Sequence, residues 1–337
     1  MTMPSSGAPQ HQGQPHDWLE RASHLSDFDR EVIRVLQQDG RISYARIADE
    51  LSRTEKQVRR RVHELRESGI IKITTVANPE VMGYEALCLL GITIDPACGI
   101  SKTTSQIAAL SGAYYVASVT GRYNVIAEIS AVDMDQLLRI LDDELSGVPG
   151  IRSVETNVYL SPPYQHPAFG AARYKKSSAG EAVQQATAID SVDRKIISHL
   201  HADGRVAYQA IARELAISES QVRLRVKRLV TSNAVKIMAL TSPEVLGFET
   251  MAMMGVTVAR NISLAQVATA VSEVPSVTYV AISAGQFNLL AEVACENKAQ
   301  LLALIDEIRL ISGVASLESW NYLRLHYRSV SPAAINE

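Results

Sequence analysis

Two related stretches of sequence decide the fold: TEKQVRRRVHEL at residues 54–65 and SESQVRLRVKRL at residues 218–229. Each opens with a hydroxyl residue followed three positions later by glutamine, Thr54 with Gln57 and Ser218 with Gln221. In this capping box each side chain satisfies a free backbone amide of the other residue, which marks the start of a helix. We therefore predict two helices with the same start signal.

The apolar residues of the first stretch, Val58, Val62 and Leu65, recur at helical spacing and define a buried stripe. The other positions must then face outward, and most of them are basic or polar. An arginine-rich helix face is either merely solvated or reads DNA. Because the same face occurs in both copies, on the third helix of its unit, we favour DNA reading. The predicted DNA-binding residues are Thr54, Lys56, Gln57, Arg59, Arg60, His63, Ser218, Ser220, Gln221, Arg223 and Lys227.

Arg61 and Arg225 directly precede buried valines, so we assign them to phosphate contacts or to pairing within the domain. Two shorter helices are predicted before each reading helix. In the first copy they are a helix that ends at Asp39-Gly40 and a helix capped by Ser43. Ala207 replaces this cap in the second copy and predicts a weaker start. The β-prone segments 70–76 and 234–240 follow and are expected to form the wings of winged helix-turn-helix domains.

The chain is an internal duplication. Asp39-Gly40-Arg41 matches Asp203-Gly204-Arg205, and Asn124 matches Asn288, at one constant offset in the numbering. Gly150 matches Gly313 at an offset smaller by one, so the second copy has lost a single position. A period this long indicates a duplicated pair of domains, because solenoid repeats run to roughly 20–50 residues.

Composition excludes several classes of protein. The net charge is −3, yet residues 25–76 hold 11 Lys/Arg against 9 Asp/Glu and residues 188–240 hold 9 against 5. Positive charge is thus segregated into the two helix-turn-helix segments, as in a modular DNA-binding protein. The sequence has no apolar run long enough to cross a bilayer. Cys88, Cys98 and Cys295 form no CxxC pair, which argues against a disulfide framework or zinc site and fits the cytoplasm.

After Gly83 the hydrophobic pattern changes. Residues 87–94 read as a strand, 101–110 as a helix, 114–119 and 125–129 as strands, 133–145 as a helix and 151–160 as a last strand. This βαββαβ order is a ferredoxin-like unit, and it recurs from Met251 to Leu325. The fold class is therefore α+β. The predicted boundaries are a disordered tail 1–22, winged helix-turn-helix 23–83, module 84–160, linker 161–187, winged helix-turn-helix 188–247, module 248–328 and tail 329–337.

The ordered set of motifs resembles the leucine-responsive/asparagine regulator (Lrp/AsnC) family. It comprises the Asp-Gly-Arg turn, the capped basic third helix, the Asn-Pro-Glu-x-x-Gly exit at residues 78–83 and the Gly-Arg-Tyr-Asn turn at residues 121–124. The resemblance covers both halves and implies a DNA-binding regulator whose companion modules dimerise and bind amino acids or related metabolites. Family members are usually single-copy, so the tandem form is a departure.

The resemblance also implies effector contacts at the turn and at the last strand of each module. Those residues are Gly121, Arg122, Tyr123, Asn124, Thr156, Gly285, Gln286, Phe287, Asn288 and Ser319. The family pattern ends this turn with aspartate, and asparagine retains only neutral hydrogen bonds, about half as strong as charge-assisted ones. An ordinary amino-acid effector is thereby in doubt. The alternative is structural, because Gly permits the positive φ of the turn and Asn tolerates it.

These inferences predict that the modules pair, within one chain or between chains, and place two reading helices about 34 Å apart on double-stranded DNA. Because Leu224 stands where the first copy has Arg60, and Ser220 where it has Lys56, the two half-sites should differ. No metal site, cofactor or catalytic set is predicted. His199 and His201, two apart on a helix, do not share a face.

Two rival interpretations remain. Sirohaem decarboxylases resemble this architecture, but their tetrapyrrole-gripping histidines have no counterpart in residues 114–124 and 277–288. The other rival is an oligomerising scaffold without DNA binding.

Overall fold

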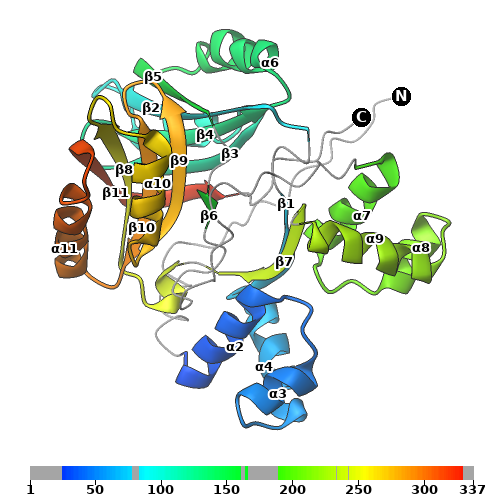
Figure 1. Cartoon of the computed structure of the whole chain (residues 1–337). Helices are drawn as coiled ribbons and strands as arrows, with labels where there is room; N and C mark the ends of the chain where they lie inside the picture. Colours follow the sequence, from blue (N-terminus) through cyan, green and yellow to red (C-terminus); the bar gives the residue numbers. More distant parts are fainter. Residues whose placement is uncertain are drawn as a thin grey trace, which may run out of the picture.

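The computed structural model describes residues 25–77, 83–160, 164–165, 189–232, 234–241 and 243–328. The predicted tails 1–22 and 329–337, most of the predicted linker 161–187 and the 78–82 part of the exit motif lie outside them. Helix-turn-helix units and β-rich modules form two separate parts of the molecule, joined through strands β1 and β7 (Figure 1).

Each half begins with the three helices that the sequence predicts. Capping boxes start the first and third helix of both copies, whereas the second is capped by Ser43 in one copy and has no side-chain cap at Ala207 in the other. The second copy thus lacks the side-chain cap on whose absence the prediction of a weaker start is based. The helices are α2 (Asp27–Gln38), α3 (Tyr44–Glu50) and α4 (Glu55–Glu67), then α7 (Ser191–Ala202), α8 (Tyr208–Glu214) and α9 (Glu219–Thr231).

The two predicted wing segments are single strands that pair with each other across the duplication. β1 (Lys72–Ala77) runs antiparallel to β7 (Val235–Leu240) as a two-stranded sheet. Helix α2 packs against β7, and α7 packs against β1. The apolar side chains of both units therefore belong to one continuous core, which includes Ile33 and Ile196. A local pattern predicts each strand, but the partner strand belongs to the other copy.

Each companion module has the predicted βαββαβ order. The first consists of β2 (Ala86–Ile94), α5 (Ile100–Ile107), β3 (Ala113–Val119), β4 (Val125–Ala131), α6 (Met134–Arg139) continued by the π-helix η2 (Ile140–Leu145), and β5 (Ile151–Tyr159). A 3-10 helix η3 (Pro243–Leu246) precedes the second, which consists of β8 (Thr250–Val258), α10 (Leu264–Glu273), β9 (Val277–Ala284), β10 (Leu289–Cys295), α11 (Lys298–Arg309) and β11 (Val314–Arg328).

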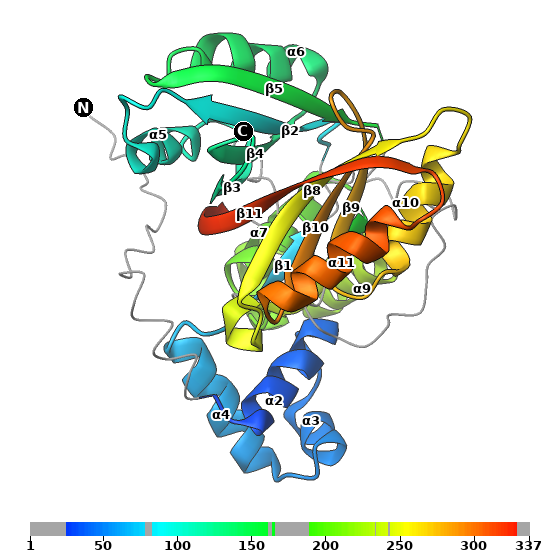
Figure 2. The same ribbon diagram turned by 90° about the vertical axis from the view of Figure 1, so that its left-hand side faces the viewer.

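The two modules pair within the chain. β5 joins β9, β11 joins β3, and β9 also pairs with β10, so the strands close into a ring around one interior. Helices α5 and α6 cover the outside of the first module, and α10 and α11 cover the outside of the second (Figure 2). The two modules of one chain thus pair with each other, which is one of the two arrangements that the sequence left open.

The predicted linker contributes to this ring, which is a correction. β6 (Tyr164–Gln165) pairs with β9 at Val280 and Tyr279. At the equivalent seam, Tyr327 and Arg328 of β11 pair with β3 at Val116 and Tyr115. The first copy therefore interrupts a strand that the second copy continues. Such a short segment cannot show a sequence period. Among the described helices, none is long and apolar enough to cross a bilayer.

Candidate nucleic-acid interface and effector modules

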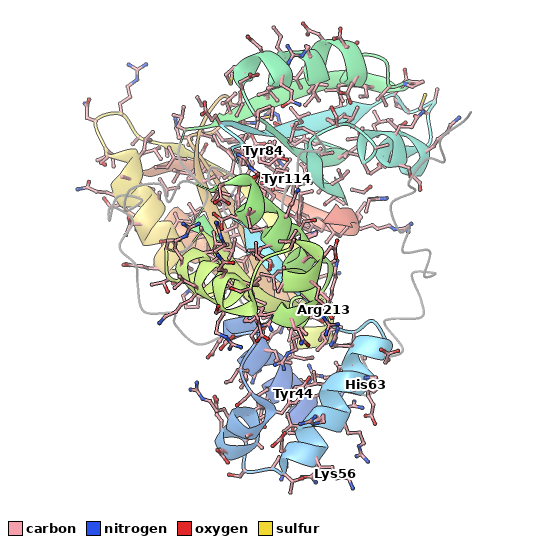
Figure 3. All side chains as sticks on the ribbon, turned by 90° about the vertical axis from the view of Figure 1, so that its right-hand side faces the viewer. Tyr44, Lys56, His63, Tyr84, Tyr114 and Arg213 are labelled. Atoms are coloured by element: carbon pink, nitrogen blue, oxygen red, sulfur yellow. The ribbon has the colours of Figure 1, made fainter. Side chains whose placement is uncertain are left out.

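The predicted reading face is exposed on both third helices. Val58, Val62 and Leu65 are buried in α4, as are Val222, Val226 and Leu229 in α9. Lys56 and His63 lie along α4 at the periphery of the molecule (Figure 3). The side chains of Arg59 and Arg60 are 67% and 75% exposed, and that of Arg223 is 66% exposed. Each of these arginines pairs with a glutamate one turn away on the same helix, and the exposed part of each guanidinium remains accessible to a polyanion.

Two of the predicted DNA-binding residues have a structural task in each copy. Gln57 Oε1 accepts a hydrogen bond from the Thr54 amide at 3.0 Å, and Gln57 N donates to Thr54 Oγ1 at 3.3 Å. Ser218 and Gln221 repeat this box at 3.0 and 3.2 Å. These four residues fix where the helices begin, and this occupies the side-chain oxygens that a base contact would use.

Arg61 and Arg225 point inward and pair within their domains. Arg61 Nη2 donates to Asp29 Oδ2 at 2.8 Å, and Arg225 Nη1 donates to Asp193 Oδ1 at 2.8 Å. Asp29 and Asp193 are almost fully buried. Burial raises the pKa of Asp29, but the hydrogen bonds from Arg61 and Ser26 outweigh it, and the pKa lies below its usual value. Of the two roles considered for these arginines, the structure shows intradomain pairing, which ties the third helix of each unit to the first.

The Asp-Gly-Arg turns join the two helix-turn-helix units. Arg41 Nη1 donates to the Gly204 carbonyl at 2.8 Å, and Arg205 Nε donates to the Gly40 carbonyl at 2.7 Å. Arg41 also lies over the ring of Tyr208, at 4.2 Å, and Arg205 over that of Tyr44, at 4.5 Å. A Cβ at residue 40 would lie 2.8 Å from the Met238 amide nitrogen, so the close approach requires glycine. These reciprocal contacts, with the β1–β7 pairing, join the two units that carry α4 and α9.

In the companion modules, the aromatic and asparagine residues of the turns predicted to bind an effector are engaged inside the protein. Asn124 Oδ1 accepts from the Ile94 amide and Asn288 Oδ1 from the Val258 amide, both at 2.8 Å. Tyr123 and Phe287 are 1% exposed. Each ring packs against a glycine of a neighbouring strand, Tyr123 against Gly91 and Phe287 against Gly255. A Cβ at either glycine would overlap the ring. Gly121 and Gly285 have the positive φ that the structural alternative expects, but Asn124 and Asn288 do not; the asparagines act structurally through their side-chain oxygens.

Trp320 fills the centre of this interior, and sequence reasoning missed it. Its ring makes edge contacts with Tyr123 at 4.9 Å and with Phe287 at 5.1 Å. The equivalent residue of the first copy is Asn157, whose Oδ1 accepts from the Phe287 amide at 3.2 Å. Aligning the two copies places Trp320 opposite Asn157, and this difference between the last strands is a sequence signal that the interior is asymmetric.

The exposed remainder of the first turn links the modules. Arg122 Nη1 donates to Glu318 Oε1 at 3.2 Å, and Arg122 Nη2 donates to Glu155 Oε1 at 3.3 Å. The second turn has Gln286 at the equivalent position, and Gly121, Gly285 and Gln286 are exposed. The turns therefore differ chemically, and only the first supplies a cation to this cross-module contact.

Glu155 and Thr156, neighbours in the sequence, face opposite sides of β5. Glu155 accepts from Tyr123 Oη at 2.6 Å on the interior side, whereas Thr156 lines a cavity beside the helix that covers the module. Ser319, the equivalent of Thr156, is half-buried, and its hydroxyl lies 3.4 Å from Asn321 Oδ1. The predicted effector residues are thus not gathered into one site.

The chemistry of the described residues includes no metal centre. They contain no group of three His, Cys, Asp or Glu side chains placed to hold a metal ion. All three cysteines are free. Burial raises the pKa of the Cys88 thiol to about 12, so it is a poor nucleophile.

Family models match both kinds of domain. A winged helix-turn-helix DNA-binding model matches residues 25–72, and an AsnC-type helix-turn-helix model matches residues 189–230. The Lrp/AsnC ligand binding domain matches twice, at residues 87–169 and 251–331. The duplication seen in the sequence is therefore a duplication of a whole regulator, helix-turn-helix and ligand-binding domain together.

Single-copy regulators resemble parts of the chain. An uncharacterised HTH-type transcriptional regulator of Pyrococcus abyssi is 32% identical over 142 residues, which is 42% of this chain and 89% of that protein. The regulatory protein AsnC of Haemophilus influenzae is 26% identical over 141 residues, 42% of this chain and 94% of that protein.

A solved structure resembles the tandem arrangement. The siroheme decarboxylase NirDL superposes over 90% of this chain and 93% of its own with a TM-score of 0.60, at 13% identity, which shows a shared fold. The domain matches and the Pyrococcus relative decide the family: the chain belongs to the Lrp/AsnC regulators, as a tandem-duplicated form.

Proposed function

We propose that one chain binds one double-stranded operator through two different reading helices, and that a small metabolite bound to the paired modules changes this binding. The observation that carries the proposal is the pair of exposed basic faces on α4 and α9, held by reciprocal Arg41 and Arg205 contacts. Phosphates are bound by exposed guanidinium and ammonium groups on a rigid frame. Two such faces on one folded unit make the binding bivalent.

The two faces present different chemistry. Arg59 and Arg223 are equivalent, but Arg60 is replaced by Leu224, which is 69% exposed, and Lys56 by Ser220. Arginine pairs bidentately with guanine, whereas an apolar side chain contacts the thymine methyl group. We therefore propose an operator with two unlike half-sites.

Of the residues predicted to contact the effector, we retain those with polar atoms at the surface or in a cavity. Arg122 and Gln286 stand at the cross-module turns, and Thr156 and Ser319 lie on the helix-facing side of the last strands. An effector at the turns would act on the contact that joins Arg122 to Glu318. Module pairing would then change, and with it the frame that holds α4 and α9.

We propose that the chain is not an enzyme. The NirDL likeness is one of fold at 13% identity. No histidine occurs in residues 114–124 or 277–288, the strand–turn–strand segments at which a tetrapyrrole enzyme of this architecture is expected to hold its pigment. Exposed basic side chains, by contrast, occur on the third helix of both copies, as at Arg59 and Arg223.

Fluorescence-anisotropy titration of the full chain with duplexes selected from a random pool tests DNA binding. Tight binding that weakens steeply with salt is expected, because each neutralised phosphate releases counterions. Arg60→Ala should cost about 1–3 kcal/mol on its selected site. Arg309→Ala, on the exposed surface of α11, is the matched control and should bind as wild type. Equal losses in both variants, or no duplex binding at low ionic strength, would refute the proposal.

A further inference from the structure

Between the start of its last helix and the glycine before its last strand, the first module has one residue more than the second. The two helices start identically, at equivalent positions of the repeat: Asp133 Oδ1 accepts from the Gln136 amide at 2.7 Å, and Asn297 Oδ1 accepts from the Gln300 amide at 2.9 Å. By Gly150 and Gly313 the offset between the copies has become smaller by one. The additional residue of the first copy therefore lies inside or just after the helix.

The structure absorbs this residue as a π turn. The second copy has an ordinary α-helix throughout α11 (Lys298–Arg309), whereas the first changes from α-helix in α6 to π-helix over Ile140–Leu145. A π turn accommodates one more residue between fixed helix ends, and such turns occur frequently at functional sites. Buried Leu145 then takes the place that buried Ile308 has in the second copy, which keeps the core in register.

A cavity of about 300 Å³ lies beside the π turn. Leu141, Leu145 and Ser146 line it from the helix side and Ile151, Val154 and Thr156 from strand β5, with Val148 between them. Leu141, Ile151, Val154 and Thr156 are partly exposed and Ser146 is exposed, so the cavity opens to solvent. Its volume is at the lower end of the range for small-molecule pockets.

The lining determines the class of ligand. Most of the lining side chains are aliphatic, two carry hydroxyl groups and none is charged. The Ser146 hydroxyl already donates to the Asp142 carbonyl within the turn, so of the two lining hydroxyls Thr156 is the better placed to donate to a ligand. Such a lining stabilises an aliphatic group by removing it from water, and a charged group would stay at the solvent mouth.

We propose that the cavity under the π turn binds a small aliphatic ligand and that the first module alone supplies this site, one per chain. This proposal rests on the modules being effector domains and names the chemistry and number of the sites. Strand β5 connects the cavity to the other module, because Val158 and Tyr159, just beyond Thr156, pair with β9. Within the π turn, Glu144 Oε2 accepts from the Ser111 amide at 2.8 Å, which joins the turn to the start of β3.

Saturation-transfer NMR of the full chain with 3-methyl-1-butanol as the probe tests the site. Ser146→Trp places a large ring over the mouth, and Arg309→Trp makes the same change at the equivalent exposed position of α11. Wild type and Arg309→Trp should transfer saturation to the probe methyl groups, and Ser146→Trp should not. Deletion of Asp143, an exposed residue of the π turn, restores the spacing of the second copy and should also abolish the signal.

Urea midpoints of each variant establish that the loss is not unfolding, and Thr156→Val gives a second, nearly isosteric change that should weaken probe binding while leaving the midpoint unchanged. Equal transfer to the probe in Ser146→Trp and Arg309→Trp would overturn the proposal, as would no transfer in wild type. Duplex titration of the same preparations separates the ligand-site proposal from the DNA-binding proposal. DNA binding by a wild-type protein that does not bind the probe would refute the ligand site alone.

Discussion

Glu128 and Glu292 occupy equivalent positions in the two modules, and both carboxyl groups are buried in the interior between the sheets. Tyr159 donates a hydrogen bond to Glu128, and Tyr322 donates to Glu292 Oε1 at 3.0 Å. Tyr115 of the first module also donates to Glu292 Oε1, at 2.5 Å. The Glu292 carboxyl group is thus held by one tyrosine from each module. Polar as well as apolar contacts therefore join the two modules in the interior.

This arrangement predicts that stability decreases as pH rises toward neutrality. Burial, which outweighs the hydrogen bonds from tyrosines, raises the pKa of Glu128 from 4.5 to about 7, and the charge of Glu292 adds to the rise. A folded-state pKa above the unfolded value means that the native state holds the proton longer. The contribution of protonated Glu128 to the free energy of unfolding is complete below about pH 4.5 and is lost as pH rises through 7. The change amounts to about 3 kcal/mol.

Glu128→Gln should remove this part of the pH dependence, because the amide cannot ionise. Urea unfolding of wild type and variant from pH 5 to pH 8 measures it. The variant should gain stability relative to wild type as pH increases. Glu249→Gln, on an exposed residue, is the control and should follow wild type. A constant difference between Glu128→Gln and wild type across this range would contradict a raised pKa.

Gly91→Ala should destabilise the first module by about 1–3 kcal/mol, because a methyl group there overlaps the buried Tyr123 ring. Denaturant midpoints measure the loss. Tyr123→Leu combined with Gly91→Ala should recover part of it, since the smaller side chain leaves room. Gly99→Ala is the matched control, because a Cβ at Gly99 meets no atom within 4 Å. Equal losses of stability in Gly91→Ala and Gly99→Ala would show that packing of the Tyr123 ring does not require glycine at position 91.

Arg41→Ala should weaken DNA binding without removing any reading residue. The Gly204 and Val206 carbonyls lose their charged donor, and hydrogen bonds of this kind contribute about 1.5–3 kcal/mol. The two reading helices would then be held less firmly, so both stability and duplex affinity should fall. Arg46→Ala, on the exposed side of α3, should change neither. If Arg41→Ala lowered stability but left affinity for a two-site duplex intact, the turns would not set the helix spacing.

The elements that could be predicted from sequence are those decided by local patterns. The capping boxes of α4 and α9 and their valine-leucine stripes each lie within a single helix and its cap, and the internal repeat supplied an independent second example. The pairing of β1 with β7 could not be predicted, because the sequence of a short strand does not identify its partner strand.

The effector residues were harder to place for a related reason. Tyr123 and Phe287 sit in polar-looking turns, yet a glycine on an earlier strand of each copy, Gly91 or Gly255, makes room to bury them. A glycine at the same place in two apolar strands is a signal of close approach that the duplication makes visible. The change in offset between the copies was visible too, but only the structure shows that a π turn absorbs it.

Leu224→Arg should make the two reading faces more alike. An arginine at this exposed position restores the side chain that α4 has at Arg60. The variant should lose preference for the selected second half-site and gain affinity for a palindrome of the first. Replacing thymine with deoxyuracil in the second half-site removes only the methyl group, which should weaken wild type and leave Leu224→Arg unaffected. Identical effects of deoxyuracil on both proteins would rule out a leucine–methyl contact.

Selection of duplexes from random DNA by the purified full chain, with sequencing of the bound fraction, tests the central claim most directly. Two exposed faces with arginine at one position and leucine at the other predict a two-part site whose halves differ in sequence, bound by one chain. Enrichment of perfectly symmetric sites alone, or of no sequence at low ionic strength, would contradict it.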